Sequence, residues 1–189
     1  MISARTLQSL EAAFTQALQQ TLVLSAADSL QIRPGKPGCA APADARKLLA
    51  LTLSAGSFRI ITLFEFRLDA ATRAHFAGPS SPAQDGNADQ RLADALAEFV
   101  NLVCGTANRL ISSDSRRTGM STPCALESSC LSHLHRLQPE QTLVLNARIG
   151  EALQFDIVLG ICLSKGTSLD FDIAPAAQEE MVGGELELF

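Results

Sequence analysis

The sequence predicts an α+β fold in which hairpin strands form one antiparallel sheet and helices pack on one face of it. Three observations support this class. Residues 47–56 and 57–66 are short segments rich in β-branched and aromatic residues, separated by a tight turn, and residues 141–150 and 153–163 form a second such pair. Two other segments carry apolar residues at intervals of three and four, which is typical of amphipathic helices. Hairpins grouped around helices are typical of α+β domains.

The chain has 189 residues, which is enough for one sizeable domain. Its apolar fraction of 47% and charged fraction of 19% are those of a compact globular protein. We predict a single domain over residues 1–174 and an acidic tail over residues 175–189. A second possibility for the end of the chain is that residues 185–189, "ELELF", dock as an added strand.

Charge and cysteine content exclude several classes of partner. The net charge of −5 does not favour binding to nucleic acid. No run of 18 apolar residues is present, so no membrane-spanning helix is expected. The first residues lack the continuous apolar core of a signal peptide. Five irregularly spaced cysteines do not suggest a disulfide framework, and we therefore expect a cytoplasmic protein.

The first half of the chain begins with a predicted helix over residues 3–23. Residues 32–45 are rich in proline, glycine and alanine and are predicted to form a loop, which leads into the first hairpin. A short helix should follow, with Asp69 as its N-cap and Gly78 at its end. Residues 79–89 are polar and contain prolines, so they are predicted to form a second loop.

The second half begins with a long predicted helix over residues 89–111. A turn is expected at residues 112–119, followed by an extended segment over residues 120–129 that Pro123 interrupts. The second hairpin then turns near Gly150 and Glu151.

The long helix contains the candidate functional residues. At about 100° per residue, an apolar stripe runs along one side and a polar stripe along the other. The polar stripe contains Asp94, Glu98, Asn101, Gly105, Asn108 and Arg109. Glu98 and Asn101 are three residues apart and therefore project from the same surface. Gly105 is unusual there, because glycine inside a helix costs roughly 0.5–1 kcal/mol relative to alanine.

Two interpretations of this stripe remain open on spacing alone. Exposed glutamate and asparagine are ordinary on a solvated helix face. Asparagine is a mediocre helix former and glycine a poor one. Their presence on the same stripe as Glu98 instead favours a surface that another chain approaches closely. Spacing does not decide between these interpretations.

Residues 124–136 contain Cys124, Cys130, His133 and His135, which are side chains that can bind zinc. Structural zinc sites usually use cysteine pairs separated by two to four residues, and the gap here is five. An extended segment would also direct these side chains to different faces. We therefore predict no metal site in this chain.

The long helix, "LAEFVNLVCGTANRL" at residues 96–110, resembles the signature helix of the CheC/CheX/FliY chemotaxis phosphatases, in which Glu-x-x-Asn is followed by a glycine four positions later. The segment "MSTPCAL" at residues 120–126 resembles the Ser/Thr-Pro segment that follows that helix. Residues 54–78 resemble the hairpin and short helix that precede it. Since only one Glu-x-x-Asn helix is present, the resemblance is to the CheX-like branch.

This resemblance implies hydrolysis of the aspartyl phosphate on a CheY-like receiver domain of a response regulator. Asn101 would orient the attacking water, and Glu98 would dock on a receiver lysine. Further docking contacts would come from Asp94, Phe99, Leu102, Gly105 and Asn108. No cofactor is expected on this chain, because the Mg²⁺ ion would belong to the phosphorylated receiver.

A homodimer joined through sheet edges is expected on two grounds. The resemblance implies it, and the strand at residues 57–66 is expected to leave an open edge that a second copy can cover. Two alternative functions remain: an adaptor that binds a receiver without hydrolysing its phosphate, related to flagellar-switch components, and a pure dimerisation module.

Overall fold

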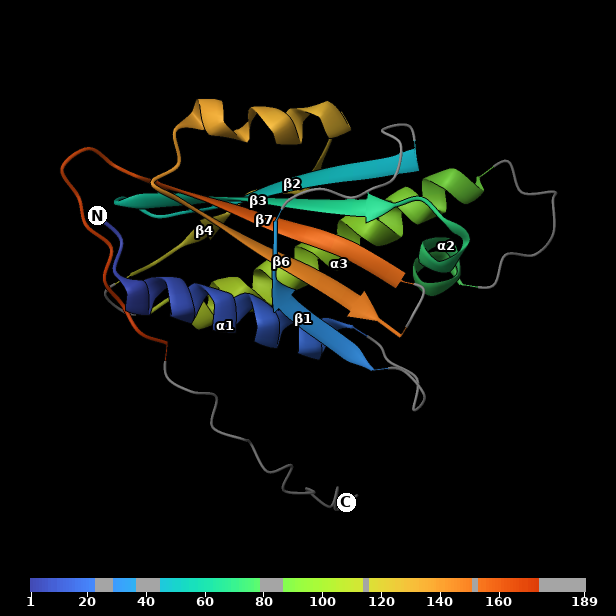
Figure 1. The fold of residues 1–189 in the computed structure, drawn as a ribbon, viewed down its shortest axis with the longest axis horizontal. Coiled ribbons are helices and arrows are strands. Elements are labelled where there is room, and N and C mark those ends of the chain that lie inside the picture. Colours follow the sequence, from blue (N-terminus) through green and yellow to red (C-terminus); the bar gives the residue numbers. More distant parts are fainter. Residues whose placement is uncertain (23–28, 37–44, 79–86, 114–115, 151–152, 174–189) are drawn as a thin grey trace, which may run out of the picture.

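The computed structural model describes residues 1–22, 29–36, 45–78, 87–113, 116–150 and 153–173. Its centre is one antiparallel sheet of seven strands (Figure 1). Along the sheet the order is β1-β6-β7-β3-β2-β4, and β5 also pairs with β2. The strands are β1 (Leu30–Pro34), β2 (Arg46–Ser54), β3 (Phe58–Arg67), β4 (Gly119–Met120), β5 (Cys124–Leu126), β6 (Gln141–Ile149) and β7 (Leu153–Leu163).

Both predicted hairpins are confirmed. Strands β2 and β3 pair from Arg46 opposite Arg67 to Ser54 opposite Arg59, and β6 and β7 pair in the same antiparallel manner. Gly150 follows β6 with a φ of 57°, a conformation that glycine adopts at little cost. Residues 151–152 of this turn lie outside the described part of the chain.

Three α-helices pack on one face of the sheet, as predicted: α1 (Ala4–Thr21), α2 (Ala70–Ala77) and α3 (Ala88–Ile111). Alternation along β3 directs Phe58, Ile60, Phe64 and Phe66 into the core beneath these helices. The predicted cap of α2 is also confirmed, since Asp69 accepts a hydrogen bond from the Thr72 amide at 3.0 Å. Most of the buried apolar surface therefore lies between the sheet and the α-helices.

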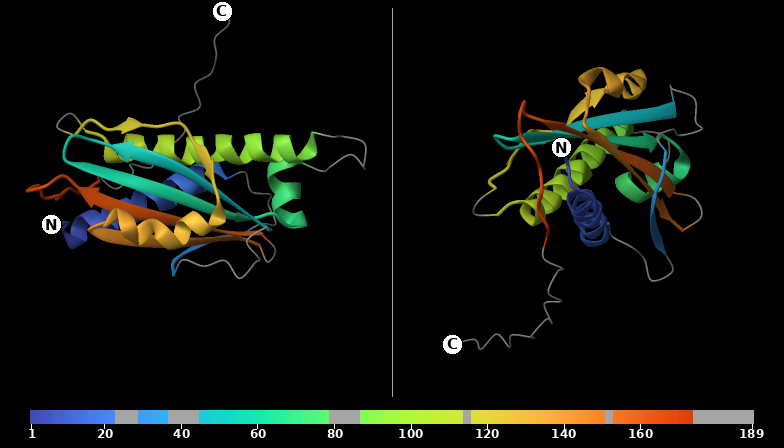
Figure 2. Two further views of the ribbon diagram at one scale, coloured as in Figure 1. Left: turned by 90° about the horizontal axis from the view of Figure 1, so that it is seen from above. Right: turned by 60° about the vertical axis from the view of Figure 1, so that its left-hand side comes forward.

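The opposite face of the sheet carries a 3₁₀ helix, η2 (Ser128–Leu137), which the sequence did not predict (Figure 2). The expectation of extended chain through this region was wrong beyond Leu126. Leu134 is the buried residue of η2, and it packs where Gly160 of β7 leaves space. A Cβ on Gly160 would lie 3.1 Å from Leu134 Cδ1. The pairing of β5 with β2, directly before η2, and the insertion of Leu134 beside Gly160 thus hold η2 on the sheet.

Two further predictions need correction. Residues 30–34 belong to the predicted loop and the segment before it, but they form β1 and pair with β6. Strand β3, which was expected to offer an open edge, is instead paired on both sides, with β2 and β7. The edges of the described sheet are β1 on one side and β4 with β5 on the other.

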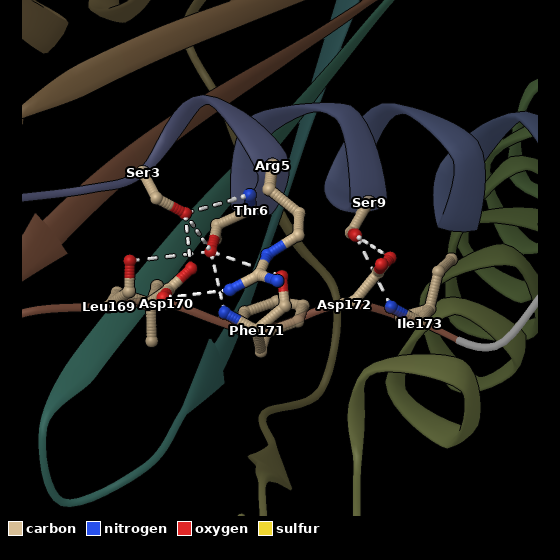
Figure 3. Close-up of polar contacts among 9 residues, drawn as sticks. All are labelled: Ser3, Arg5, Thr6, Ser9, Leu169, Asp170, Phe171, Asp172 and Ile173. Atoms are coloured by element: carbon tan, nitrogen blue, oxygen red, sulfur yellow. Dashed lines mark hydrogen bonds and ion pairs between the residues drawn. The ribbon is translucent and has the colours of Figure 1, made fainter.

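The last described residues run along α1 and are fixed to it by polar side chains (Figure 3). Thr6 Oγ1 accepts a hydrogen bond from the Phe171 amide at 2.8 Å, and Ser9 Oγ accepts one from the Ile173 amide at 3.2 Å. Hydrogen bonds from Ser3 and then Arg5 hold the pKa of Asp170 below its usual value. The predicted tail, residues 175–189, lies outside the described residues.

Candidate functional site

Helix α3 is positioned by a continuous apolar side. Its buried residues are Leu92, Leu96, Phe99, Val100, Val103, Cys104, Thr106, Ala107 and Ile111. Asp89 lies in the first turn and Arg109 in the last, where each charge complements the helix dipole. An ion pair of 2.7 Å between Arg73 and Asp89 also links α2 to α3. The helix is therefore a rigid support for the residues on its other side.

Glu98 and Asn101 lie on the outward side of α3, as predicted. The Glu98 side chain is exposed, and Asn101 is half-buried. Among the described residues, neither side chain has a hydrogen-bond or ion-pair partner. A carboxylate and a neutral amide, one helical turn apart on a rigid helix, are thus available to a molecule outside this chain.

Gly105 lies one helical turn beyond Asn101 on the same surface of α3, beside strand β4. A Cβ added to it would meet only Met120 Cε, at 3.9 Å, which is an ordinary van der Waals contact. Packing among the described residues therefore does not require glycine at this position. Since glycine is a poor helix former, the residue is more readily explained by a need for space outside the chain.

Two predicted docking residues have partners within the described chain. Asp94 is exposed and accepts a hydrogen bond from Gln90 Nε2 at 2.7 Å. Asn108 donates from Nδ2 to the carbonyl oxygen of Thr118 at 3.5 Å, while its buried Oδ1 has no partner among the described atoms. Asn108 therefore connects α3 to the segment that leads into β4.

Phe99 was predicted as a docking contact, and the structure corrects this. Its side chain is only 6% exposed and packs against Phe64, Phe66, Phe76 and Phe155. Leu102, by contrast, is 50% exposed and remains available to a partner.

Met120 belongs to the same surface and was not predicted. It is 39% exposed and lies on β4, which packs beside α3. Only long-range pairing places it there, because Met120 is opposite Leu53 in the β2–β4 register. The signal in the sequence was its position in "MSTPCAL", directly after the long helix and its turn.

The cysteines and histidines do not form a metal site among the residues that the structure describes, which contain no cluster of three or more metal-binding side chains. Cys104 is buried beside Thr62, and burial raises the pKa of its thiol to about 12. It is therefore a core residue and not a nucleophile. Arg109 donates to Thr106 Oγ1 at 2.9 Å, on the helix itself. Of the described helices, none is long and apolar enough to cross a membrane.

Comparison with solved structures identifies the fold. A chain of the CheX–CheY–BeF₃–Mg²⁺ complex from Borrelia burgdorferi matches with a TM-score of 0.62 at 12% identity, over 82% of this chain and 97% of that one. A CheC-like superfamily protein from Shewanella sp. PV-4 matches with a TM-score of 0.53 at 13% identity, over 84% and 98%. The chemotaxis protein CheX from Vibrio vulnificus gives 0.53 at 15% identity, over 84% and 99%.

No protein-family model matches the sequence, and comparison with curated proteins finds no match either. The structural matches nevertheless span most of both chains in each case. The chain therefore has the CheX- and CheC-like α+β fold, as its sequence predicted.

Proposed function

We propose that this protein hydrolyses the aspartyl phosphate of a CheY-like receiver domain. The observation that carries the proposal is the pair formed by Glu98 and Asn101 on α3, which is outward-facing and has no partner among the described residues. The fold supports it, since one chain of the same fold was crystallised in a complex that contains CheY.

Asn101 supplies the catalytic group in this proposal. Its side chain offers one carbonyl acceptor and two amide donors, which is enough to hold a water in line with phosphorus. Because the amide is neutral, it does not repel the phosphoryl oxygens as a carboxylate would. Asparagine is not basic enough to remove a proton, so its contribution is the position of the water.

Glu98 supplies docking in this proposal. A receiver brings its own Mg²⁺ ion and a lysine to its acyl phosphate, so these groups belong to the substrate. The carboxylate of Glu98 forms a charge-assisted hydrogen bond with that lysine and sets the position of Asn101. Asp94, Leu102 and Gly105 border the same surface, and Asn108 shapes it by holding the chain at Thr118.

Two further proposals concern the oligomeric state of the protein and its location in the cell. A homodimer joined through a sheet edge would use β1, because β4 borders the surface that the receiver must reach. Sedimentation or light scattering at several concentrations tests this. A receiver substrate also agrees with the predicted cytoplasmic location.

The experiment follows phosphate release from CheY-type receivers phosphorylated with acetyl phosphate in Mg²⁺, with the CheY of Borrelia burgdorferi in the panel. Wild-type protein should accelerate release, and Asn101→Ala should abolish most of the acceleration. Glu98→Ala should raise the receiver concentration needed for half-maximal rate. Gln8→Ala is the matched control, because Gln8 is also a polar, exposed helix residue but lies on α1 and not on α3.

The outcomes separate the alternatives. If the wild type binds phosphorylated receiver without accelerating release, the protein is an adaptor. If it binds none of the receivers, the dimerisation module is the better account. Acceleration that survives Asn101→Ala would refute the assignment of the catalytic residue while keeping the activity.

A further inference from the structure

Large apolar side chains are exposed at five positions in the described part of the chain: Met1, Leu102, Met120, Leu126 and Leu137. Leu126 and Leu137 both line a cavity of about 310 Å³ under η2, on the opposite face of the sheet from α3. Leu102 and Met120, in contrast, belong to two different elements on the side of α3. Their positions relative to Glu98 and Asn101 can be worked out from helix geometry.

Leu102 lies on one flank of the candidate pair. At about 100° per residue, the order around α3 is Asn101, Gly105, Glu98 and then Leu102, and the whole set spans about 100°. Leu102 therefore borders Glu98 on the side away from Asn101. Half of its side chain remains in water.

Met120 lies on the other flank. Asn108 is the next polar residue around α3 beyond Asn101, and its half-buried side chain donates from Nδ2 to the carbonyl oxygen of Thr118, directly before β4. A Cβ on Gly105 would come within 3.9 Å of Met120 Cε. Strand β4 thus approaches α3 one turn beyond Asn101, so that Met120 borders the polar pair at that end and Leu102 borders it beside Glu98.

The segment that carries Met120 is firmly held. Met120 and Gly119 pair with Leu53 and Ser54 of β2. The Ser121 amide donates to the Thr52 carbonyl oxygen at 2.9 Å, and Ser121 Oγ accepts from the Thr52 amide at 3.0 Å. A methionine on such a support keeps a flexible side chain, which adapts to an irregular apolar surface.

We propose that Leu102 and Met120 form a two-sided apolar clamp that binds apolar side chains of the receiver beside its phosphorylation site. The inference rests on the proposed function and adds its specificity-determining contacts. When the receiver docks, the two side chains exclude water around Glu98 and Asn101, so the polar contacts form in a medium of lower dielectric constant. Because Gly105 has no side chain, it leaves space beside Leu102 and Met120 for the receiver to come close to α3.

The test compares Leu102→Ala and Met120→Ala with Leu137→Ala. Leu137 is the matched control, because it is also 50% exposed but lies on η2. Hydrolysis of phosphorylated receiver gives KM and kcat, and binding to the receiver loaded with Mg²⁺ and beryllofluoride gives Kd without turnover. Each clamp variant should raise KM and Kd about tenfold, which corresponds to 1.4 kcal/mol. The kcat should stay within twofold, and Leu137→Ala should change nothing.

Failure of the clamp and failure of the phosphatase give different results. Unchanged KM and Kd in both clamp variants, or an equal rise in Leu137→Ala, would overturn the clamp while hydrolysis persists. Wild-type protein that binds but does not hydrolyse would remove the phosphatase, and Kd would still test the clamp. Absence of any binding by the wild type would overturn both.

Discussion

Phe99 of α3 and Phe76 of α2 pack with their ring centroids 5.0 Å apart. This contact joins two helices that are adjacent in sequence through the hydrophobic core beneath them. It also places Phe99 behind the surface that carries Glu98, so that the two neighbouring residues have different roles. The ring supports the helix, and the carboxylate faces outward.

Truncation of Phe99 should therefore affect stability and not docking. We expect Phe99→Ala to lower the free energy of unfolding by about 3–5 kcal/mol, because a buried aromatic ring leaves a cavity when it is removed. Chemical denaturation measures this. A loss of receiver affinity with an unchanged unfolding midpoint would instead show that Phe99 contacts the partner.

Gly105→Ala should separate stability from activity. Alanine fits beside Met120 and is a better helix former, so the free energy of unfolding should rise by about 0.5–1 kcal/mol. The added methyl group should weaken receiver binding, because it occupies the space that the partner needs. Denaturation and KM measurements check both parts.

The control for this change is Gly56→Ala, at an exposed turn where a Cβ would meet nothing within 4 Å. It should leave KM unchanged. A Gly105→Ala variant that hydrolyses receiver phosphate with the wild-type KM would contradict the role given to this glycine.

Thiol reactivity should differ sharply between the described cysteines. Burial raises the pKa of the Cys104 thiol to about 12, so almost no thiolate is present at pH 8, and the side chain is also shielded. Cys124 and Cys130 are exposed and should react first. Mass spectrometry after timed alkylation reads each site. Equal labelling of Cys104 in the native protein would show that α3 opens easily.

The hydroxyl of Thr6 should stabilise the attachment of the last described segment to α1. Thr6→Val removes the acceptor of the buried Phe171 amide, and we expect it to cost about 1–3 kcal/mol. Thr6→Ser, which keeps the hydroxyl, is the control and should cost less. Thermal unfolding of both variants tests this, and a Thr6→Val variant no less stable than Thr6→Ser would contradict the role given to the hydroxyl.

The strongly periodic parts of the fold could be predicted from the sequence, and the parts that depend on distant partners could not. Helix α3 and both hairpins have apolar residues at the expected intervals. Strand β1 contains Gln31, Arg33 and Pro34, and it is a strand because β6 lies beside it. Helix η2 packs on the sheet because Gly160, which is distant in sequence, leaves space for Leu134.

The same distinction applies to the candidate site. Residues on the exposed arc of α3 follow from helix geometry, so Glu98, Asn101 and Leu102 could be placed in advance. At about 100° per residue, Phe99 lies only about 20° from Leu92, inside the apolar stripe, so helix geometry favoured a core position and only the family resemblance suggested docking. Met120 reaches the site through strand pairing, and no local pattern reports that contact.

The most direct test of the central claim is the maximal rate of receiver dephosphorylation by Asn101→Asp, measured in single turnovers at saturating protein. This substitution keeps the size and the acceptor oxygen of Asn101, but it replaces the neutral amide with a negative charge. We predict a rate about 100-fold below that of the wild type, which corresponds to about 2.7 kcal/mol of activation free energy. A rate equal to that of the wild type would contradict the proposal that a neutral amide at this position orients the attacking water.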